Sequence, residues 1–184
     1  HTGDPGAVTL TEPSPSAGGE IVEVRPKQQA VLMCGFQTIP LTHPDRAPLE
    51  LIDEACSDLG SRLFLRIREE MGLAYFVGTS QLLGLARGAF TFYLGTDPAK
   101  LAEVQAALRE EIARLAADGL TAEELARAKA KLLGSIAIRQ QSNDALGISC
   151  ALDELYGLGF DHYRGWPARL EAVLREALPG VKVN

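Results

Sequence analysis

The sequence predicts an α+β fold, a two-layer sandwich in which helices cover one face of a mainly antiparallel, mixed sheet. Three observations support this prediction. One early segment is continuously apolar, and two later segments alternate apolar and polar residues across a short glycine-bounded loop. The second half carries apolar residues at helical spacing almost throughout. Strands and helices are therefore segregated along the chain, which is typical of the α+β class.

The expected strands lie in the first half of the chain. A short strand is predicted at residues 20–24, and the apolar run QAVLMCGF at residues 29–36 is typical of a buried central strand. A proline-rich loop is expected over residues 38–48. Residues 73–80 and 89–95 then alternate with strand period, so they are predicted to form an antiparallel hairpin.

Most of the expected helices carry a start or stop signal. Ser61 is placed to cap the second helix, and Asp97 followed by Pro98 begins the third. The sequence TAEE at residues 121–124 has the spacing of a capping box. Helices are expected over residues 49–59, 62–71, 98–119, 121–141, 142–156 and 162–177.

Length and composition fit one globular domain. The 184 residues are 46% hydrophobic and 23% charged, which is ordinary for a chain that buries a core. Residues 1–19 are rich in Gly, Pro, Ser and Thr and are interpreted as a tag remnant and interdomain linker, with the domain itself over residues 20–184. The net charge of −6 comes without a cluster of Lys and Arg, so no nucleic-acid partner is expected. No apolar run approaches the ~18 residues of a spanning helix, so no membrane span is expected.

The histidines do not form a metal site in the sequence. His1, His43 and His162 lie far apart, and none has a second ligand at helical spacing. No cofactor or metal is therefore expected in this segment. The glycine-flanked serine of a hydrolase and the glycine-rich loops that bind phosphates are not found either, so the chain lacks a self-sufficient active site.

The cysteines give no disulfide framework. Cys34, Cys56 and Cys150 are odd in number and widely spaced, and we interpret them as buried, reduced thiols. Reduced thiols slightly favour the cytoplasm over the periplasm, but they leave the compartment unknown.

Four phrases of the sequence occur in the same order in one peptidase family. They are LGSRLFLRIREEMGLAYFV at residues 59–77, GAFTF at 88–92, GTDP at 95–98 and GLTAEELARAK at 119–129. Together they resemble the C-terminal, non-zinc-binding half of the M16 zinc peptidases, which are the pitrilysin/insulinase-type and processing-peptidase-like enzymes. The likeness spans residues 20–165.

The resemblance implies the LuxS/processing-peptidase-like metallohydrolase fold and a half-enzyme. In that family a homologous half with the motif His-x-x-Glu-His holds zinc, in the same chain or in a partner subunit. The half without zinc supplies an Arg and a Tyr that contact an extended peptide substrate, and these map to Arg68 and Tyr75. The chain departs from the family in two places. Extra glycines before Ser61 are missing, and a final helix and strand are not present.

The positions of Arg68 and Tyr75 suit that role. Gly72 turns the chain between them, so the two side chains can reach one region. A guanidinium cation and a neutral phenol could then hold a peptide carbonyl whose oxygen becomes negative. The structural alternative is that Arg68 belongs to a solvated charge run at a helix C-terminus and Tyr75 belongs to the core.

The leading interpretation is the non-catalytic, substrate-binding half of a zinc-dependent metalloendopeptidase, inactive alone. One alternative is a structural or peptide-guiding domain of an M16-like assembly without proteolysis. Another is an unrelated thiol enzyme that uses one of the three cysteines. A His-x-x-Glu-His motif in the partner half would separate the first two, and loss of activity on alkylation would favour the third.

Overall fold

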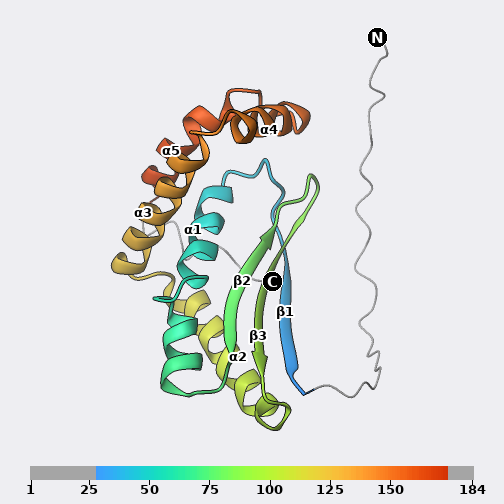
Figure 1. Ribbon diagram of the computed structural model, residues 1–184, viewed down its shortest axis with the longest axis vertical. Coiled ribbons are helices and arrows are strands. Elements are labelled where there is room, and N and C mark those ends of the chain that lie inside the picture. The colour runs from blue at the N-terminus through green and yellow to red at the C-terminus, as the bar shows by residue number, and fades with distance from the viewer. Residues whose placement is uncertain (1–27, 174–184) are drawn as a thin grey trace.

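Three strands form the sheet in the computed structural model, which describes residues 28–173 (Figure 1). They are β1 (Ala30–Thr38), β2 (Phe76–Leu82) and β3 (Gly88–Thr96), in the order β1-β3-β2. β2 and β3 form the predicted hairpin, and both pairings in the described part of the sheet are antiparallel. The strand predicted at residues 20–24 lies outside the described residues.

β1 has one covered face and one open face, although its sequence is continuously apolar. Leu32, Cys34 and Phe36 pack against the core, whereas Val31 and Met33 are 59% and 67% exposed. The strand pairs with β3 alone among the described strands. The prediction that this strand is buried is therefore wrong for one of its two faces, because apolar residues also occupy the open face.

Helices make up the other layer, and their predicted caps are largely observed. The Asp97 carboxylate accepts a hydrogen bond from the Ala99 N–H at 2.8 Å, and Thr121 and Glu124 close the predicted capping box. The helical segments are α1 (Arg46–Cys56), η1 (Phe64–Glu70), η2 (Pro98–Lys100), α2 (Leu101–Asp118), α3 (Ala122–Arg139), α4 (Asn143–Leu155) and α5 (His162–Ala172).

The helices lie on one side of the sheet (Figure 1). α1 and η1 contact β2, α2 contacts β1 and η1, and α3 packs against α1. The shared core consists mainly of apolar side chains. Its best-buried side chains, each at most 1% exposed, include Leu51, Ile67, Leu94, Val104 and Leu108. The predicted α+β architecture with helices over one sheet face is confirmed.

The bounds of α1 and α5 differ from the predicted ones. α1 begins at Arg46, inside the predicted loop, because Pro48 lies in the first helical turn, where a missing backbone N–H breaks no hydrogen bond. It ends at Cys56, before the expected stop at Gly60. α5 ends at Ala172 rather than at residue 177 as predicted, because Val173 has an extended backbone, and residues 174–177 lie outside the described part of the chain.

α4 lies across one end of the molecule in Figure 1 and packs mainly on α5. None of its residues is buried. Within residues 28–173, no helix is both long and apolar enough to cross a bilayer.

Candidate functional site

Arg68 lies in the last turn of η1, which is a π-helix rather than the ordinary helix predicted for residues 62–71. The Ser61 hydroxyl accepts a hydrogen bond from the Phe64 N–H at 3.2 Å, as predicted for a helix cap. At the other end the Met71 N–H donates to the Arg66 carbonyl at 3.0 Å, one residue further back than in an α-helix. π-Helical turns are rare in proteins as a whole, and those that occur are often found at functional sites.

A tight turn follows the π-helix and leads to Tyr75. Gly72 has φ of 60°, a left-handed conformation that costs a residue with a Cβ more than it costs glycine. Leu73 and Ala74 are buried and anchor the turn in the core. Tyr75 itself is 58% exposed, so the alternative that it belongs to the core is wrong.

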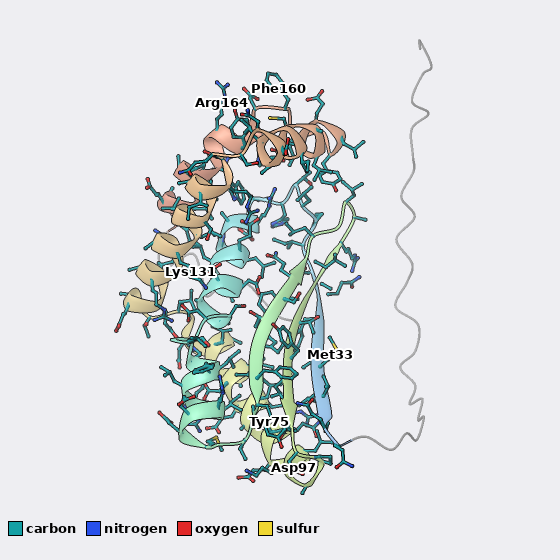
Figure 2. All side chains as sticks on the ribbon, viewed as in Figure 1. Met33, Tyr75, Asp97, Lys131, Phe160 and Arg164 are labelled. Atoms are coloured by element: carbon teal, nitrogen blue, oxygen red, sulfur yellow. The ribbon has the colours of Figure 1, made fainter. Side chains whose placement is uncertain are left out.

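Three hydrogen bonds hold this turn against the end of the sheet. The Thr96 hydroxyl donates to the Leu73 carbonyl at 2.6 Å, and the Tyr75 N–H donates to the Gly95 carbonyl at 2.8 Å. From the solvent side, the Lys100 ammonium donates to the Gly72 carbonyl at 3.0 Å. Figure 2 shows Tyr75 at the same end of the sheet as Asp97, which directly follows β3.

The Arg68 side chain is 41% exposed and rests on its own helix. Its guanidinium lies over the Phe64 ring, 4.6 Å from the ring centroid, and its Nε is 3.9 Å from a Glu69 carboxylate oxygen. Arg68 and Tyr75 are both described in full, and they form no hydrogen bond with each other. The structure thus places the pair at the two ends of one turn, with both polar groups available to a further molecule.

Arg66 has a structural role, because it forms ion pairs that join the π-helix to α2. Its Nε is 2.8 Å from the carboxylate of Glu111, a buried residue on α2, and its Nη2 donates to Glu110 at 3.1 Å. Removing Arg66 would leave a buried carboxylate with less compensation. Sequence spacing distinguishes Arg66 from Arg68 by helix face, but it does not reveal this ion pair.

A second ion pair, between Arg62 and Glu124, joins the residues just before η1 to α3. Arg62 donates to both carboxylate oxygens of Glu124 and also, through Nη2, to the Gly119 carbonyl at 2.9 Å. Burial acts to raise the pKa of Glu124, but hydrogen bonds from Arg62 and Thr121 outweigh it, so the pKa lies below its usual value. The capping box identifies Glu124 in the sequence; nothing there indicates that Arg62 is its partner.

The described residues contain no group of three His, Cys, Asp or Glu side chains that could share a metal ion. All three cysteines are free thiols, but only Cys56 is buried, so the prediction of three buried thiols is wrong for Cys34 and Cys150. Burial raises the pKa of the Cys56 thiol to about 12, which leaves it almost wholly protonated at neutral pH.

A pocket of about 520 Å³ lies elsewhere, between α1, α3, α4 and α5. Among the residues that line it are Arg46, His162 and Trp166, and neither Arg68 nor Tyr75 is one of them. The candidate site is therefore an exposed edge that a further domain could complete, rather than a concave pocket of this chain.

Comparison with known proteins identifies one family. Residues 2–132 match the family model described as the peptidase M16 inactive domain. An uncharacterized zinc protease of Streptomyces coelicolor is 32% identical over 153 residues, which cover 78% of this chain and 32% of the relative. The uncharacterized zinc protease YmxG of Bacillus subtilis is 30% identical over 119 residues, which cover 64% of this chain and 29% of the relative.

Solved structures have the same fold. A peptidase M16 inactive domain from Pseudomonas fluorescens aligns with a TM-score of 0.76 and 25% identity, covering 83% of this chain and 36% of that one. An inactive peptidase domain from Bordetella parapertussis aligns with a TM-score of 0.72 at 16% identity, covering 85% of this chain and 86% of that one. The second likeness, at this identity, concerns the fold alone.

The chain belongs to the M16 peptidase family, and within it to the inactive domains, which confirms the resemblance found in the sequence. It spans about a third of the length of the curated relatives it matches. The assignment of Arg68 and Tyr75 to substrate contact stays a prediction.

Proposed function

We propose that this domain is the substrate-binding half of a zinc-dependent metalloendopeptidase and supplies Arg68 and Tyr75 to a zinc site held by a homologous half. The observation that carries the proposal is the placement of two exposed polar side chains at the ends of one turn that three hydrogen bonds hold in place. The family membership supports the pairing with a zinc-binding half.

The two side chains offer complementary chemistry to a peptide bond. The Arg68 guanidinium is a permanent cation with several N–H donors, and the Tyr75 hydroxyl is a neutral donor. Both can donate to a substrate carbonyl oxygen, and their hydrogen bonds strengthen as negative charge develops on that oxygen. In the complete enzyme the zinc of the other half would activate the attacking water. An extended peptide is the substrate class that this arrangement fits.

Mutagenesis of the enzyme assembled with its zinc-binding half tests the proposal. Arg68→Ala and Tyr75→Phe are each expected to lower kcat by roughly 10²–10³-fold, as loss of one donor to a developing oxyanion does. Zinc content should not change, because neither residue is a metal ligand. The measurements are initial rates on a quenched fluorescent peptide and metal analysis of each variant.

The control is Arg109→Ala, because Arg109 is an exposed arginine on α2. Arg66 is unsuitable as a control, since it neutralises the buried Glu111. Full activity in both Arg68→Ala and Tyr75→Phe, or an equal loss in Arg109→Ala, would overturn the proposal. An assembly that binds peptide without cleaving it would instead support the peptide-guiding alternative.

A further inference from the structure

We propose that Thr96 is a positioning residue, and that its buried hydroxyl fixes the position of Tyr75 relative to Arg68. This inference rests on the proposed function, because it assigns a residue that orients the substrate-contact pair. Thr96 does not touch the substrate in this proposal. It acts through the backbone of the turn between the pair.

The Thr96 hydroxyl has one partner, and that partner belongs to the turn. Thr96 is the last residue of β3 and is fully buried, at 0% exposure. Its Oγ1 donates to the Leu73 carbonyl at 2.6 Å, and Leu73 is itself buried. A hydroxyl and a carbonyl so buried each need a hydrogen-bond partner, and here each one finds it in the other. The position of the Leu73 carbonyl is therefore fixed to the end of β3.

The Leu73 peptide groups connect the two candidate residues. The Leu73 N–H donates to the carbonyl of Ile67, the residue before Arg68, at 3.0 Å. On the other side, the Tyr75 N–H donates to the carbonyl of Gly95, the residue before Thr96, at 2.8 Å. Leu73 is therefore joined to the π-helix through its N–H and to the end of β3 through its carbonyl, which accepts the Thr96 hydroxyl. Tyr75 is joined to the same end of β3 through its own N–H.

At Gly72 the turn is not held by side-chain packing, so hydrogen bonds to its carbonyl groups restrain its backbone. Gly72 has φ of 60°, and no heavy atom lies within 4 Å of the place where a Cβ would be. The Lys100 ammonium also donates to this turn, at the Gly72 carbonyl, but it does so from an exposed position where water competes. The buried hydrogen bond from Thr96 is therefore the stronger constraint.

The first test uses this chain alone and does not depend on activity. Thr96→Val removes the hydroxyl at nearly constant shape, and Thr96→Ser restores it. Amide hydrogen exchange should accelerate at Leu73 and Tyr75 by roughly tenfold in Thr96→Val and return toward the wild-type rate in Thr96→Ser. Lys100→Met should have a smaller effect. Unchanged exchange at both amides in Thr96→Val would overturn the proposal.

The matched control is Thr79→Val, which removes another buried threonine hydroxyl. Thr79 Oγ1 donates to the Asp53 carbonyl of α1 at 3.1 Å and shares a hydrogen bond of 2.7 Å with the Ser57 hydroxyl, and neither partner belongs to the turn. Both valine variants should lose stability in urea unfolding, but only Thr96→Val should change exchange at Tyr75 beyond the change in global unfolding. Equal acceleration at Tyr75 in both variants would mean that Thr96 acts through general stability, and the proposal would fail.

The second test uses the assembled enzyme and separates this inference from the proposed function. Thr96→Val should lower kcat by about 10- to 100-fold with little change in KM, since small misplacement of a positioned group is costly, and Thr96→Ser should recover it. If Arg68→Ala lowers kcat and Thr96→Val does not, the positioning role is wrong while the function stands. If neither Arg68→Ala nor Tyr75→Phe lowers kcat, the proposed function is wrong, and the exchange rates still decide whether Thr96 orders the turn.

Discussion

Arg62 and Glu124, 62 positions apart in the sequence, meet in a forked hydrogen-bond pair, with Arg62 Nε 2.8 Å from Glu124 Oε1. Both side chains are largely covered, at 16% and 12% exposure. Glu124 also accepts the Thr121 N–H at 2.7 Å, so one carboxylate serves the cap of α3 and the ion pair. The segment that carries Arg68 is thus fastened to α3 at its beginning and to the sheet at its end.

Glu124→Gln should destabilise the chain by about 1.5–3 kcal/mol, because it weakens a charge-assisted pair and the capping box together. Urea unfolding followed by circular dichroism measures the change. Glu123→Gln is the matched control, since Glu123 is exposed in the same first turn of α3. Equal losses in the two variants would show that the Arg62 pair contributes nothing specific.

The same carboxylate predicts a dependence on acid. Because the folded chain holds the pKa of Glu124 below its usual value, the stabilisation is complete above the unfolded-chain pKa near 4.5 and is lost as the pH falls through the folded pKa. Stability should therefore decline in acid more steeply for the wild type than for Glu124→Gln. Parallel declines, measured as unfolding midpoints between about pH 6 and about pH 3, would contradict this.

His162 should make the helical end of the molecule sensitive to mild acid. Burial lowers the pKa of its imidazole, and the cations of Arg169 and Arg46 act in the same direction, while Asp153 opposes them. The folded chain therefore favours the neutral ring. Stability is complete above the unfolded-chain pKa near 6.5 and decreases as the pH falls below it, because the unfolded chain takes up the proton more readily.

The pH dependence is measured by thermal unfolding between about pH 7.5 and about pH 5.5. His162→Gln should flatten the slope, because the group that titrates differently in the two states is gone. A slope unchanged in His162→Gln would exclude this histidine as its source.

Two glycines should respond to alanine in opposite directions. Gly72 has φ of 60°, so Gly72→Ala should destabilise the chain by about 1 kcal/mol, although no atom obstructs the new methyl group. Gly134 lies inside α3, where nothing obstructs a Cβ either, so Gly134→Ala should stabilise by about 0.5–1 kcal/mol. Calorimetric unfolding measures both, and a shift of the same sign in both would refute the argument from φ.

Cys56 should resist alkylation in the folded chain. Burial raises the pKa of its thiol to about 12, whereas Cys34 and Cys150 are partly accessible. With iodoacetamide near pH 8, mass spectrometry should find label at Cys34 or Cys150 well before Cys56, and at all three after unfolding. Early labelling of Cys56 together with loss of a catalytic activity would revive the thiol-enzyme alternative.

The sequence predicted those elements whose signals are local. The β2–β3 hairpin follows from alternation, and the starts of η2 and α3 follow from Asp97 and Thr121, because a cap needs only neighbouring residues. β2 begins at Phe76 rather than at residue 73 as predicted, since Leu73 and Ala74 are buried in the core before the ladder starts. The alternating pattern alone cannot distinguish those two situations.

Features that depend on tertiary contacts were not predictable. The π-helical turns of η1, the buried Glu111 that Arg66 neutralises and the hydroxyl of Thr96 under the turn all require knowledge of what packs alongside. The candidate pair itself came from the family resemblance. Without that resemblance, the charge and spacing of the neighbouring residues are equally typical of an arginine in a solvated run of charged residues.

The strand order also determines when the sheet can form during synthesis. Among the described strands, β1 and β2 each pair only with β3, which is the last of the three to leave the ribosome. The first β1–β3 pair, Thr38 with Gly88, must close a long loop, whereas the β2–β3 hairpin closes locally. In a nascent or truncated chain that stops before β3, the apolar strand β1 has no strand to pair with, and the apolar face of α1 has no complete sheet to pack on. Such an intermediate exposes apolar surface, and intermediates of this kind aggregate and are bound by chaperones.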